Sequence, residues 1–361
     1  MERDPTNDVD SYRAPFREWL AARWPFAVNL EIGEISSPAT GYSAQTLILP
    51  VTFERDAVAC EERVVLRVEN PGPSIYPQQA PGLDVEVEIQ YRTMELLSKV
   101  SKAPLAPLIG YEGDSGVLGS PFFAMGFIEG EVPVLEPMYT QAGFFFDASP
   151  DDRRRMIENG LRVLADFHKL DWTAAGFDWL VAPGVTPDVQ AQVDIWQRFA
   201  QHELRDRRHP NLERAFEWLH ANAPSGLEPA FSWGDSRPGN ILWRNFEPVC
   251  VTDFENVAIA PPEVDLGWWL MFDRSCHDAM GTPRLPGEPS LEEQRDFYAS
   301  CLGRDIGDTF YCELLAAVRY AAIVVRVMNR MEERGQIPSD HTIWLDNPPA
   351  QLVAGYLGDL E

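Results

Sequence analysis

The sequence predicts an α+β fold in two lobes: a small N-terminal lobe built on an antiparallel sheet, and a larger, mostly helical C-terminal lobe. Short apolar runs typical of strands gather before residue 126, and apolar residues at helical spacing dominate after residue 150. Between the two patterns, Gly130 and Pro133 mark a passage from one lobe to the other. We therefore expect residues 1–126 to form the small lobe and residues 127–361 the large one.

The N-terminal lobe is expected to begin with a helix and to continue into strands. Two strands enclose a loop that contains Gly41 and Ser43, and the next strand carries a single cation, Arg67. A helix with Glu86 and Glu88 near its start follows. In chain order we expect a helix at Tyr12–Trp24, strands at Leu30–Ile35, Gln45–Phe53 and Val64–Val68, a helix at Asp84–Ser101 and a strand at Pro121–Met125.

The C-terminal lobe is expected to be helical around one strand hairpin. Apolar spacing predicts a helix from Arg153 to Leu170, in which His168 is expected to be a core residue with satisfied hydrogen bonds. Residues 175–225 are rich in aromatic side chains and predict a helical insertion on the substrate side. Apolar residues between 241 and 251 predict the hairpin, and the chain after it is expected to be mostly helical.

The most specific chemical signal lies around this hairpin. Asp235 is followed five positions later by Asn240, and Asp253 comes after the apolar strand. Each short motif alone is typical of a turn or a strand edge, but their order around a hairpin is typical of a phosphoryl-transfer centre. The first carboxylate takes up a hydroxyl proton, and Asn240 and Asp253 supply oxygen ligands for Mg²⁺. Arg237 is placed to neutralise charge on the transferred group.

These motifs resemble those of the aminoglycoside phosphotransferase family, also called the phosphotransferase-enzyme family. Asp235, Asn240, Asp253 and Glu255 match the family pattern, and Trp233 stands where the family usually has His. The segment 261–269 resembles the branch associated with acyl-CoA dehydrogenases, and residues 30–330 follow the family pattern. The resemblance implies a protein-kinase-like fold that binds ATP and Mg²⁺ between its lobes. It also implies transfer of the γ-phosphate to a hydroxyl of a small molecule.

The resemblance also implies roles for residues outside the motif. Arg67 lies where kinases keep a phosphate-binding lysine, although a strand-edge Arg at the surface is the alternative. Glu88 is the preferred partner of Arg67, with Glu86 as the other candidate, because family members often share the pattern around Gln90. Asp265 is expected to brace the catalytic loop. The implied nucleotide-binding residues are Gly41, Ser43, Arg67, Glu88, Met125 and Phe127, the last two through the backbone near the adenine.

Composition excludes several classes of protein. The net charge of −26 argues against nucleic-acid binding, and the scattered acids favour a solvated acidic surface over a cation-binding pocket. No apolar run is long enough for a membrane span, and the N-terminus lacks the order of a signal peptide. Five cysteines without paired spacing favour reduced thiols and a cytoplasmic protein. The sequence contains neither a Walker phosphate loop nor a zinc-binding His-Glu-x-x-His helix.

Two questions stay open from the sequence. Trp233 and Arg67 depart from the general kinase pattern, so a nucleotide-binding pseudo-kinase without transfer activity is the alternative function. A serine hydrolase built on Ser236 is a more distant one. The acceptor is not defined: Tyr139 and Phe144–Phe146 suggest an apolar hydroxylated compound but are equally typical of a core. The oligomeric state is not predicted.

Overall fold

A computed structural model describes residues 9–37 and 43–360 and divides into two compact units. Of the described residues, the first unit comprises 9–37, 43–74, 84–95 and 105–129, and the second comprises 75–83, 96–104 and 130–360. The division expected from the sequence, after residue 126, lies close to the last of these boundaries. Two short segments, 75–83 and 96–104, group with the second unit although they precede that boundary.

The first unit is built on a five-stranded antiparallel sheet in the order β1-β2-β3-β5-β4. Alternation explains its longest strands: Val64, Leu66 and Val68 are buried on one face, and the residues between them point to the other. β4, which the sequence did not predict, is short and lies at the edge of the sheet. The strands are β1 (Val28–Ile32), β2 (Gln45–Arg55), β3 (Val58–Val68), β4 (Leu108–Glu112) and β5 (Phe122–Gly126).

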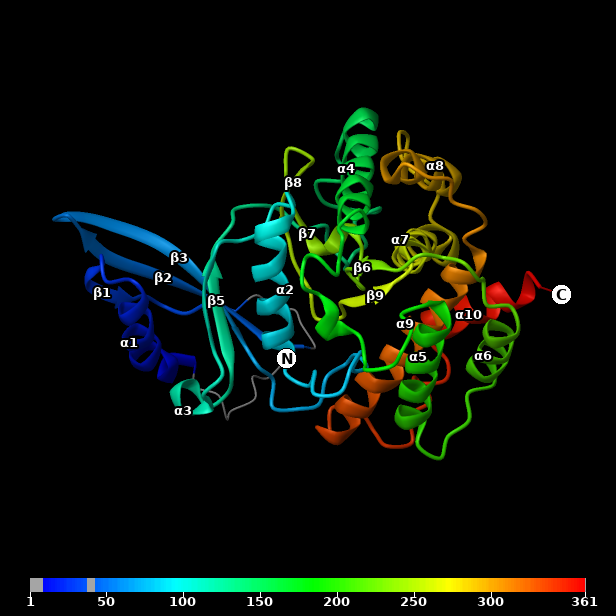
Figure 1. Cartoon of the computed structure of the whole chain (residues 1–361), viewed down its shortest axis with the longest axis horizontal. Coiled ribbons are helices and arrows are strands. Elements are labelled where there is room, and N and C mark those ends of the chain that lie inside the picture. The colour runs from blue at the N-terminus through cyan, green and yellow to red at the C-terminus, as the bar shows by residue number, and fades with distance from the viewer. Residues whose placement is uncertain (1–8, 38–42, 361) are drawn as a thin grey trace. The chain divides into compact units, whose positions relative to one another are not determined.

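Helices cover both faces of this sheet (Figure 1). α1 (Arg13–Arg23) and α3 (Ser115–Leu118) share a core with the face that carries Leu66 and Phe122. α2 (Glu86–Val100) packs on the opposite face, where the rings of Tyr91 and Phe123 lie 6.2 Å apart. Because Arg67 pairs with Phe123 across β3 and β5, both side chains lie on the α2 face.

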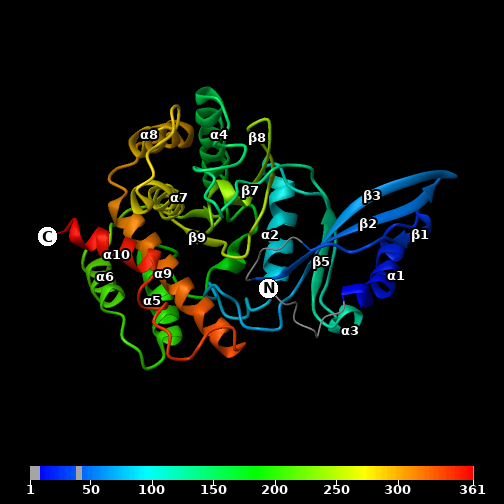
Figure 2. The same ribbon diagram turned by 180° about the vertical axis from the view of Figure 1, so that it is seen from behind.

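The second unit is mostly helical, which confirms the predicted α+β class (Figure 2). Several of its helices begin at polar caps: Ser149 and Asp188 accept hydrogen bonds from backbone N–H groups in the first turns of α4 and α5, and Ser290 forms a capping box with Glu293 at α8. The helices are α4 (Pro150–His168), α5 (Val189–Leu204), α6 (Pro210–Ala221), α7 (Pro262–His277), α8 (Leu291–Leu302), α9 (Phe310–Glu333) and α10 (Pro348–Gly358).

Two small antiparallel strand pairs lie among these helices and carry the segment 233–240, which the sequence predicts to be catalytic and which we call the catalytic loop. β6 (Ala230–Ser232) pairs with β9 (Ala258–Ala260), and β7 (Ile241–Arg244) pairs with β8 (Glu247–Val251), which confirms the predicted hairpin. The short 3-10 helix η3 (Pro238–Asn240) connects β6 to β7. The other 3-10 helices are η1 (Val9–Tyr12), η2 (Asp178–Leu180) and η4 (Asp278–Met280).

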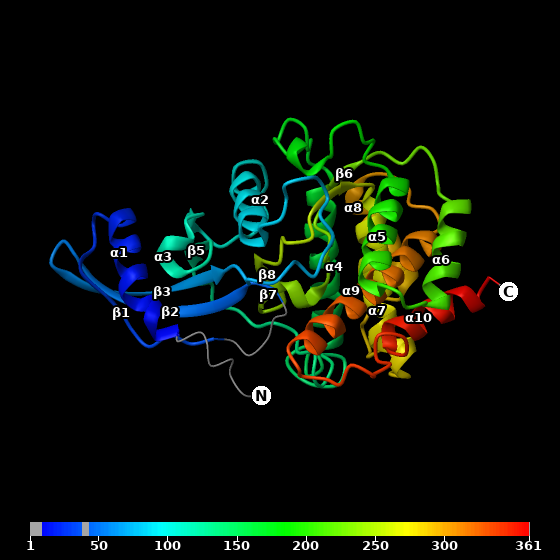
Figure 3. The same cartoon turned by 90° about the horizontal axis from the view of Figure 1, so that it is seen from below.

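α9 is the central helix of the second unit and lies between α5 and α7 (Figure 3). Most of its residues are buried, including the cations Arg319, Arg326 and Arg330. Among residues 9–37 and 43–360, no helix combines the length and the apolar character needed to cross a bilayer.

Candidate active site

Asp235 lies at the centre of the catalytic loop, between β6 and η3. Its side chain is buried, and its carboxylate accepts hydrogen bonds from three side chains. Asn240 Nδ2 lies 2.7 Å from Oδ2, Trp268 Nε1 lies 2.8 Å from Oδ1, and Arg237 Nε lies 3.1 Å from Oδ1. These donors fix the orientation of the carboxylate and offset the cost of burying its charge.

The structure brings Asn240 and Asp253 together at the base of the β7–β8 hairpin. Thr252 donates to the Asn240 carbonyl from its backbone N at 2.9 Å and from its Oγ1 at 3.0 Å. These two hydrogen bonds hold the residue before Asp253 next to Asn240. Asp253 itself has a left-handed backbone with φ 61°. Because Asn240 Nδ2 is directed to the carbonyl and carboxylate of Asp235, its Oδ1 is directed elsewhere and is the atom suited to a metal ion.

Arg237 joins the two carboxylates electrostatically. Burial lowers the pKa of Arg237, but the negative charges of Asp235 and Asp253 outweigh burial, and the pKa is raised. The guanidinium also lies over the ring of Phe272, 5.1 Å from its centroid. Asp235, Arg237 and Asp253, three residues that the sequence predicts for the site, therefore form one charged group.

Asp265, near the start of α7, braces the catalytic loop, as the sequence predicted. Its carboxylate accepts hydrogen bonds from Ser232 Oγ at 2.8 Å, from Trp233 N at 2.6 Å and from Gly234 N at 3.0 Å. His168 lies between Asp265 Oδ2 and the Tyr298 hydroxyl, which confirms it as a satisfied core residue. Burial raises the pKa of Asp265, but the hydrogen bonds from His168 and Ser232 outweigh it, and the pKa is lowered. The brace is therefore held in its ionised form.

Trp233 ties the catalytic loop to the segment that carries Asp253. Its indole Nε1 donates to the backbone carbonyl of Thr252 at 2.9 Å and to that of Asp253 at 3.2 Å. The ring is fully buried between Phe167 and Phe254. A donor is all that these two carbonyls require, so the indole links the two segments that carry the predicted chemistry.

Gly234 is required by the geometry of this loop. Its φ is 86°, and a Cβ at this position would lie 1.8 Å from the carbonyl oxygen of Asn256. Gly226 also has a left-handed backbone (φ 76°), but a Cβ there would meet no atom within 4 Å, so it is a matched control. We expect Gly226→Ala to cost about 1 kcal/mol from backbone strain. Gly234→Ala should cost a further ~1–3 kcal/mol from overpacking.

Thermal melting of both variants checks this expectation. Gly234→Ala should melt several degrees below Gly226→Ala. Equal melting temperatures would show that the contact between Gly234 and Asn256 does not restrict the loop.

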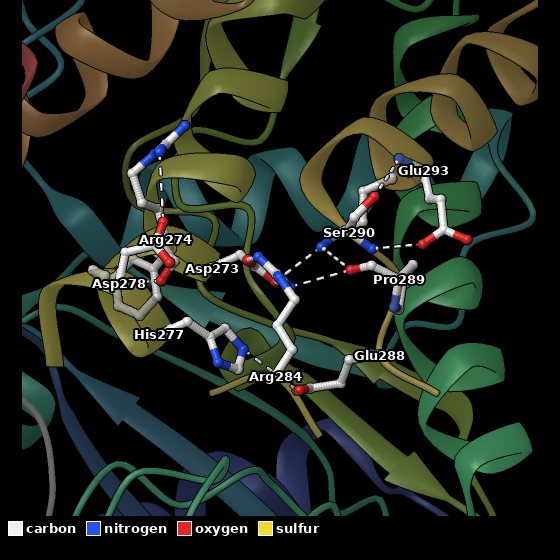
Figure 4. A network of polar contacts seen from close by, with 12 residues as sticks. Asp273, Arg274, His277, Asp278, Arg284, Glu288, Pro289, Ser290 and Glu293 are labelled. Carbon is white, nitrogen blue, oxygen red and sulfur yellow. Dashed lines mark hydrogen bonds and ion pairs between the residues drawn. The ribbon is translucent and has the colours of Figure 1, made fainter. Parts of the chain in front are cut away.

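A buried polar network anchors the C-terminal end of α7, the helix that supplies Trp268 and Phe272 (Figure 4). The Asp273 carboxylate accepts hydrogen bonds from the guanidinium of Arg284 and, at 2.9 Å, from Gln294 Nε2. His277 lies 3.5 Å from Glu288 Oε1. Burial lowers the pKa of His277, but the contact with Glu288 and the charge of Asp273 outweigh it and raise the pKa. The network ties α7 to the loop before α8, away from the catalytic loop.

Tyr76 lies near the predicted site, although the sequence did not reveal it. It belongs to the segment 75–83, which groups with the second unit and is joined to α5 by a hydrogen bond of 2.9 Å between Gln79 and Gln192. Burial and the negative charges of Asp235, Glu255 and Asp253 raise the pKa of the Tyr76 phenol well above its usual value. The phenol therefore lies within the field of these carboxylates. No local motif marks it, since it is more than 150 residues from the loop.

In the first unit, Arg67 lies among acidic residues on the α2 face of the sheet. Its Nη1 donates to Thr46 Oγ1 at 2.6 Å. Glu69 Oε2 accepts from the backbone N of Val87 in the first turn of α2. Burial raises the pKa of Glu69, as does the charge of Glu86, whereas the Val87 N–H and the charge of Arg67 lower it. Glu69, Glu86 and Arg67 therefore lie within electrostatic reach of one another.

Glu88 has a different environment from the one that the sequence suggested. Its Oε2 accepts a hydrogen bond from the Tyr111 hydroxyl at 3.3 Å. Glu86, two residues earlier on another face of α2, is buried. The geometry of this unit therefore favours Glu86 over Glu88 as the acidic residue that accompanies Arg67.

The other residues predicted to bind the nucleotide differ in their environments. Gly41 lies outside the described residues, and the carbonyl of Ser43 accepts a hydrogen bond from Asn70. Met125 pairs with Val65 inside the sheet. The N–H of Phe127 donates to the Arg63 carbonyl at 3.0 Å, and Arg63 also stacks on the Phe127 ring. Any contact of Phe127 with adenine must therefore use its carbonyl or its ring.

The aromatic residues that the sequence suggested for binding the acceptor differ in burial. Tyr139 and Phe145 are buried and pack edge to face at 5.2 Å, so they belong to the core. Phe144 packs against Phe246, and Phe146 is exposed.

Similarity to known proteins agrees with this geometry. The model of the phosphotransferase enzyme family matches residues 50–293. The chain is 23% identical over 257 residues to a probable acyl-CoA dehydrogenase, IBR3, of Arabidopsis thaliana, with coverage of 68% of this chain and 29% of that protein. It is 26% identical over 249 residues to acyl-CoA dehydrogenase family member 11 of Homo sapiens, with coverage of 66% and 30%. The chain thus spans less than a third of the length of these relatives.

Solved structures share the fold at low identity. A candidate aminoglycoside phosphotransferase from Ralstonia eutropha superposes with a TM-score of 0.70 at 20% identity, covering 96% of this chain and 98% of that one. A choline kinase from Cryptosporidium parvum gives a TM-score of 0.57 at 11% identity, covering 91% and 89%. Since the family model spans well over half of the chain and the motif residues converge, this chain belongs to the phosphotransferase enzyme family.

Proposed function

We propose that this protein is an ATP- and Mg²⁺-dependent phosphotransferase that moves the γ-phosphate to a hydroxyl of a small molecule. The convergence of Asp235, Asn240 and Asp253 around one buried loop is the observation that carries the proposal. Family membership supports phosphotransferase chemistry, and the nucleotide, the metal and the alcohol acceptor are our inference.

Asp235 is the proposed acceptor of the substrate's hydroxyl proton. Phosphoryl-transfer transition states are loose, so the main task of this residue is to orient the hydroxyl toward the phosphorus and then to take the proton. The hydrogen bonds from Trp268 and Asn240 hold the carboxylate in one orientation for this purpose. Arg237 donates to Asp235 from Nε, and the other N–H groups of its guanidinium are proposed to bind the oxygens of the transferred group.

Asn240 and Asp253 are the proposed metal ligands. Their amide and carboxylate oxygens are the donors that Mg²⁺ prefers, and Mg²⁺ is usually held by one or two such groups together with phosphates and water. In the described part of the chain, no three His, Cys, Asp or Glu side chains are grouped to hold a metal ion. When bound, Mg²⁺ would neutralise charge on the phosphates.

Arg67 is the proposed phosphate ligand of the first unit. We expect Arg67→Ala to raise the apparent KM for ATP about tenfold or more and to leave the fold intact, because its half-buried side chain contributes little to the core. Arg67→Lys should recover little if bidentate geometry matters and much if charge alone suffices. Steady-state kinetics at varied ATP make the comparison. An unchanged KM in Arg67→Ala would assign Arg67 to the sheet surface.

A screen of acceptors tests the proposal as a whole. ADP formation should be measured over a panel of alcohols with Mg²⁺ and ATP. The relatives' names direct the panel to aminoglycosides, choline and hydroxylated acyl thioesters of coenzyme A. Acceptor-dependent ADP formation is the expected result, and its absence over the whole panel would favour a nucleotide-binding pseudo-kinase. The link that Trp233 forms with Asp253 supports activity over that alternative.

A further inference from the structure

Arg319, in the middle of α9, has an environment that the catalytic motif does not explain. Its side chain is 2% exposed, and its guanidinium lies between two indoles, 5.0 Å from the ring of Trp196 on α5 and 4.7 Å from that of Trp268 on α7. Nη2 donates to the backbone carbonyl of Gly234 at 2.6 Å. Figure 3 shows α9 between these two helices, so one cation connects three helices of the unit with the catalytic loop.

The positive charge of Arg319 is compensated without a direct ion pair to any described carboxylate. Within the described ranges, no carboxylate lies in ion-pair distance of it, and its Nε is buried without a hydrogen-bond partner. Burial lowers the pKa of Arg319, and the charges of Asp265 and Asp235 act against that effect. Burying a cation is costly unless nearby groups compensate it. The compensation here comes from the braced catalytic loop and from two aromatic faces.

We infer that Arg319 is a positioning residue for phosphoryl transfer, holding Asp235 through two separate contacts. The first is the hydrogen bond to the Gly234 carbonyl, which fixes the peptide unit immediately before Asp235. The second runs through Trp268, which stacks on Arg319 and donates from Nε1 to the Asp235 carboxylate at 2.8 Å. The inference depends on the proposed function, in which Asp235 orients the acceptor hydroxyl.

The arrangement needs arginine in particular. A planar guanidinium stacks on two indoles and donates in its own plane at the same time, whereas the ammonium of lysine is a compact, strongly hydrated charge that cannot do both. Methionine fills much of the same volume but offers no donor to the carbonyl. A displacement of about 1 Å at a reacting group lowers rate by as much as 10²-fold, so loss of either contact should be visible in kcat.

Arg319→Lys and Arg319→Met should be compared with Arg326→Met as a matched control. Arg326 is a buried cation on the same helix, but it lies 3.4 Å from Glu203 and away from the loop. We expect both Arg319 variants to lower kcat by about 10- to 100-fold with an unchanged KM for ATP. Arg326→Met should lower stability and leave both kcat and the KM for ATP unchanged. Unchanged kcat in Arg319→Met, measured per folded protein, would overturn the inference.

Amide hydrogen exchange gives a readout that does not depend on activity. The peptide covering residues 232–240 should lose protection in Arg319→Ala and keep it in Arg326→Ala. Millimolar guanidinium should enter the space left in Arg319→Ala and restore protection and kcat together, with no effect on the loop in Arg326→Ala. Unaltered loop exchange in Arg319→Ala would contradict the inference. If the wild type transfers no phosphate to any acceptor, the proposed function fails, and loop exchange with its guanidinium rescue alone decides whether Arg319 positions the loop.

Discussion

Asp235→Asn should retain binding of Mg²⁺ and ATP and lose phosphoryl transfer by about two to four orders of magnitude, the usual contribution of a positioned proton acceptor. The amide cannot accept the hydroxyl proton. It also has a single acceptor oxygen, whereas Asn240, Trp268 and Arg237 all direct donors at this side chain. The substrate hydroxyl would therefore be both without a base and out of position.

Single-turnover kinetics with saturating nucleotide measure this loss, and thermal shifts with Mg²⁺ and ATP show whether binding is retained. Asp166→Asn, an exposed carboxylate of α4, is the control and should behave as the wild type. Transfer by Asp235→Asn within a few-fold of the wild-type rate would remove Asp235 from the chemistry.

Asp253→Ala should abolish the part of nucleotide binding that depends on metal. A ligand at about 100 times its Kd stabilises the folded state by about 2.7 kcal/mol, so the wild type should melt at a higher temperature with ATP and Mg²⁺ than with ATP and EDTA. Because Asp253 supplies a proposed ligand oxygen, this difference should vanish in the variant. Asp305→Ala, at an exposed position, should keep it. A full Mg²⁺-dependent shift in Asp253→Ala would exclude it from the metal site.

The catalytic loop could be predicted because its residues are close in sequence. Asp235 and Asn240 are five residues apart, and the turn that joins β6 to β7 brings them within 2.7 Å of each other. Trp268 and Arg319 gave no comparable signal. They reach the loop from 33 and 85 residues away, and contacts of that kind depend on how α7 and α9 pack, which a local pattern does not encode.

The first unit shows the same limit on a smaller scale. Two residues along a helix rotate a side chain by about 200°, so Glu86 and Glu88 cannot share a face of α2. The sequence motif favoured Glu88, but packing of α2 on the sheet buries Glu86 and leaves Glu88 to the hydroxyl of Tyr111. In β3, by contrast, the observed alternation of burial puts Arg67 on the face opposite Val64, Leu66 and Val68. Periodicity thus gives the face of a strand more reliably than the phase of a helix against its neighbour.

The most direct test of the account is the chemical fate of the γ-phosphate. ³¹P NMR of wild-type protein with ATP, Mg²⁺ and an alcohol panel should show a new phosphate monoester resonance that depends on one acceptor class and grows in step with ADP. The same mixture with Asp235→Asn should show the ATP signals alone over that time. Release of inorganic phosphate without an ester for any alcohol, at equal rates in both proteins, would contradict phosphoryl transfer at this site.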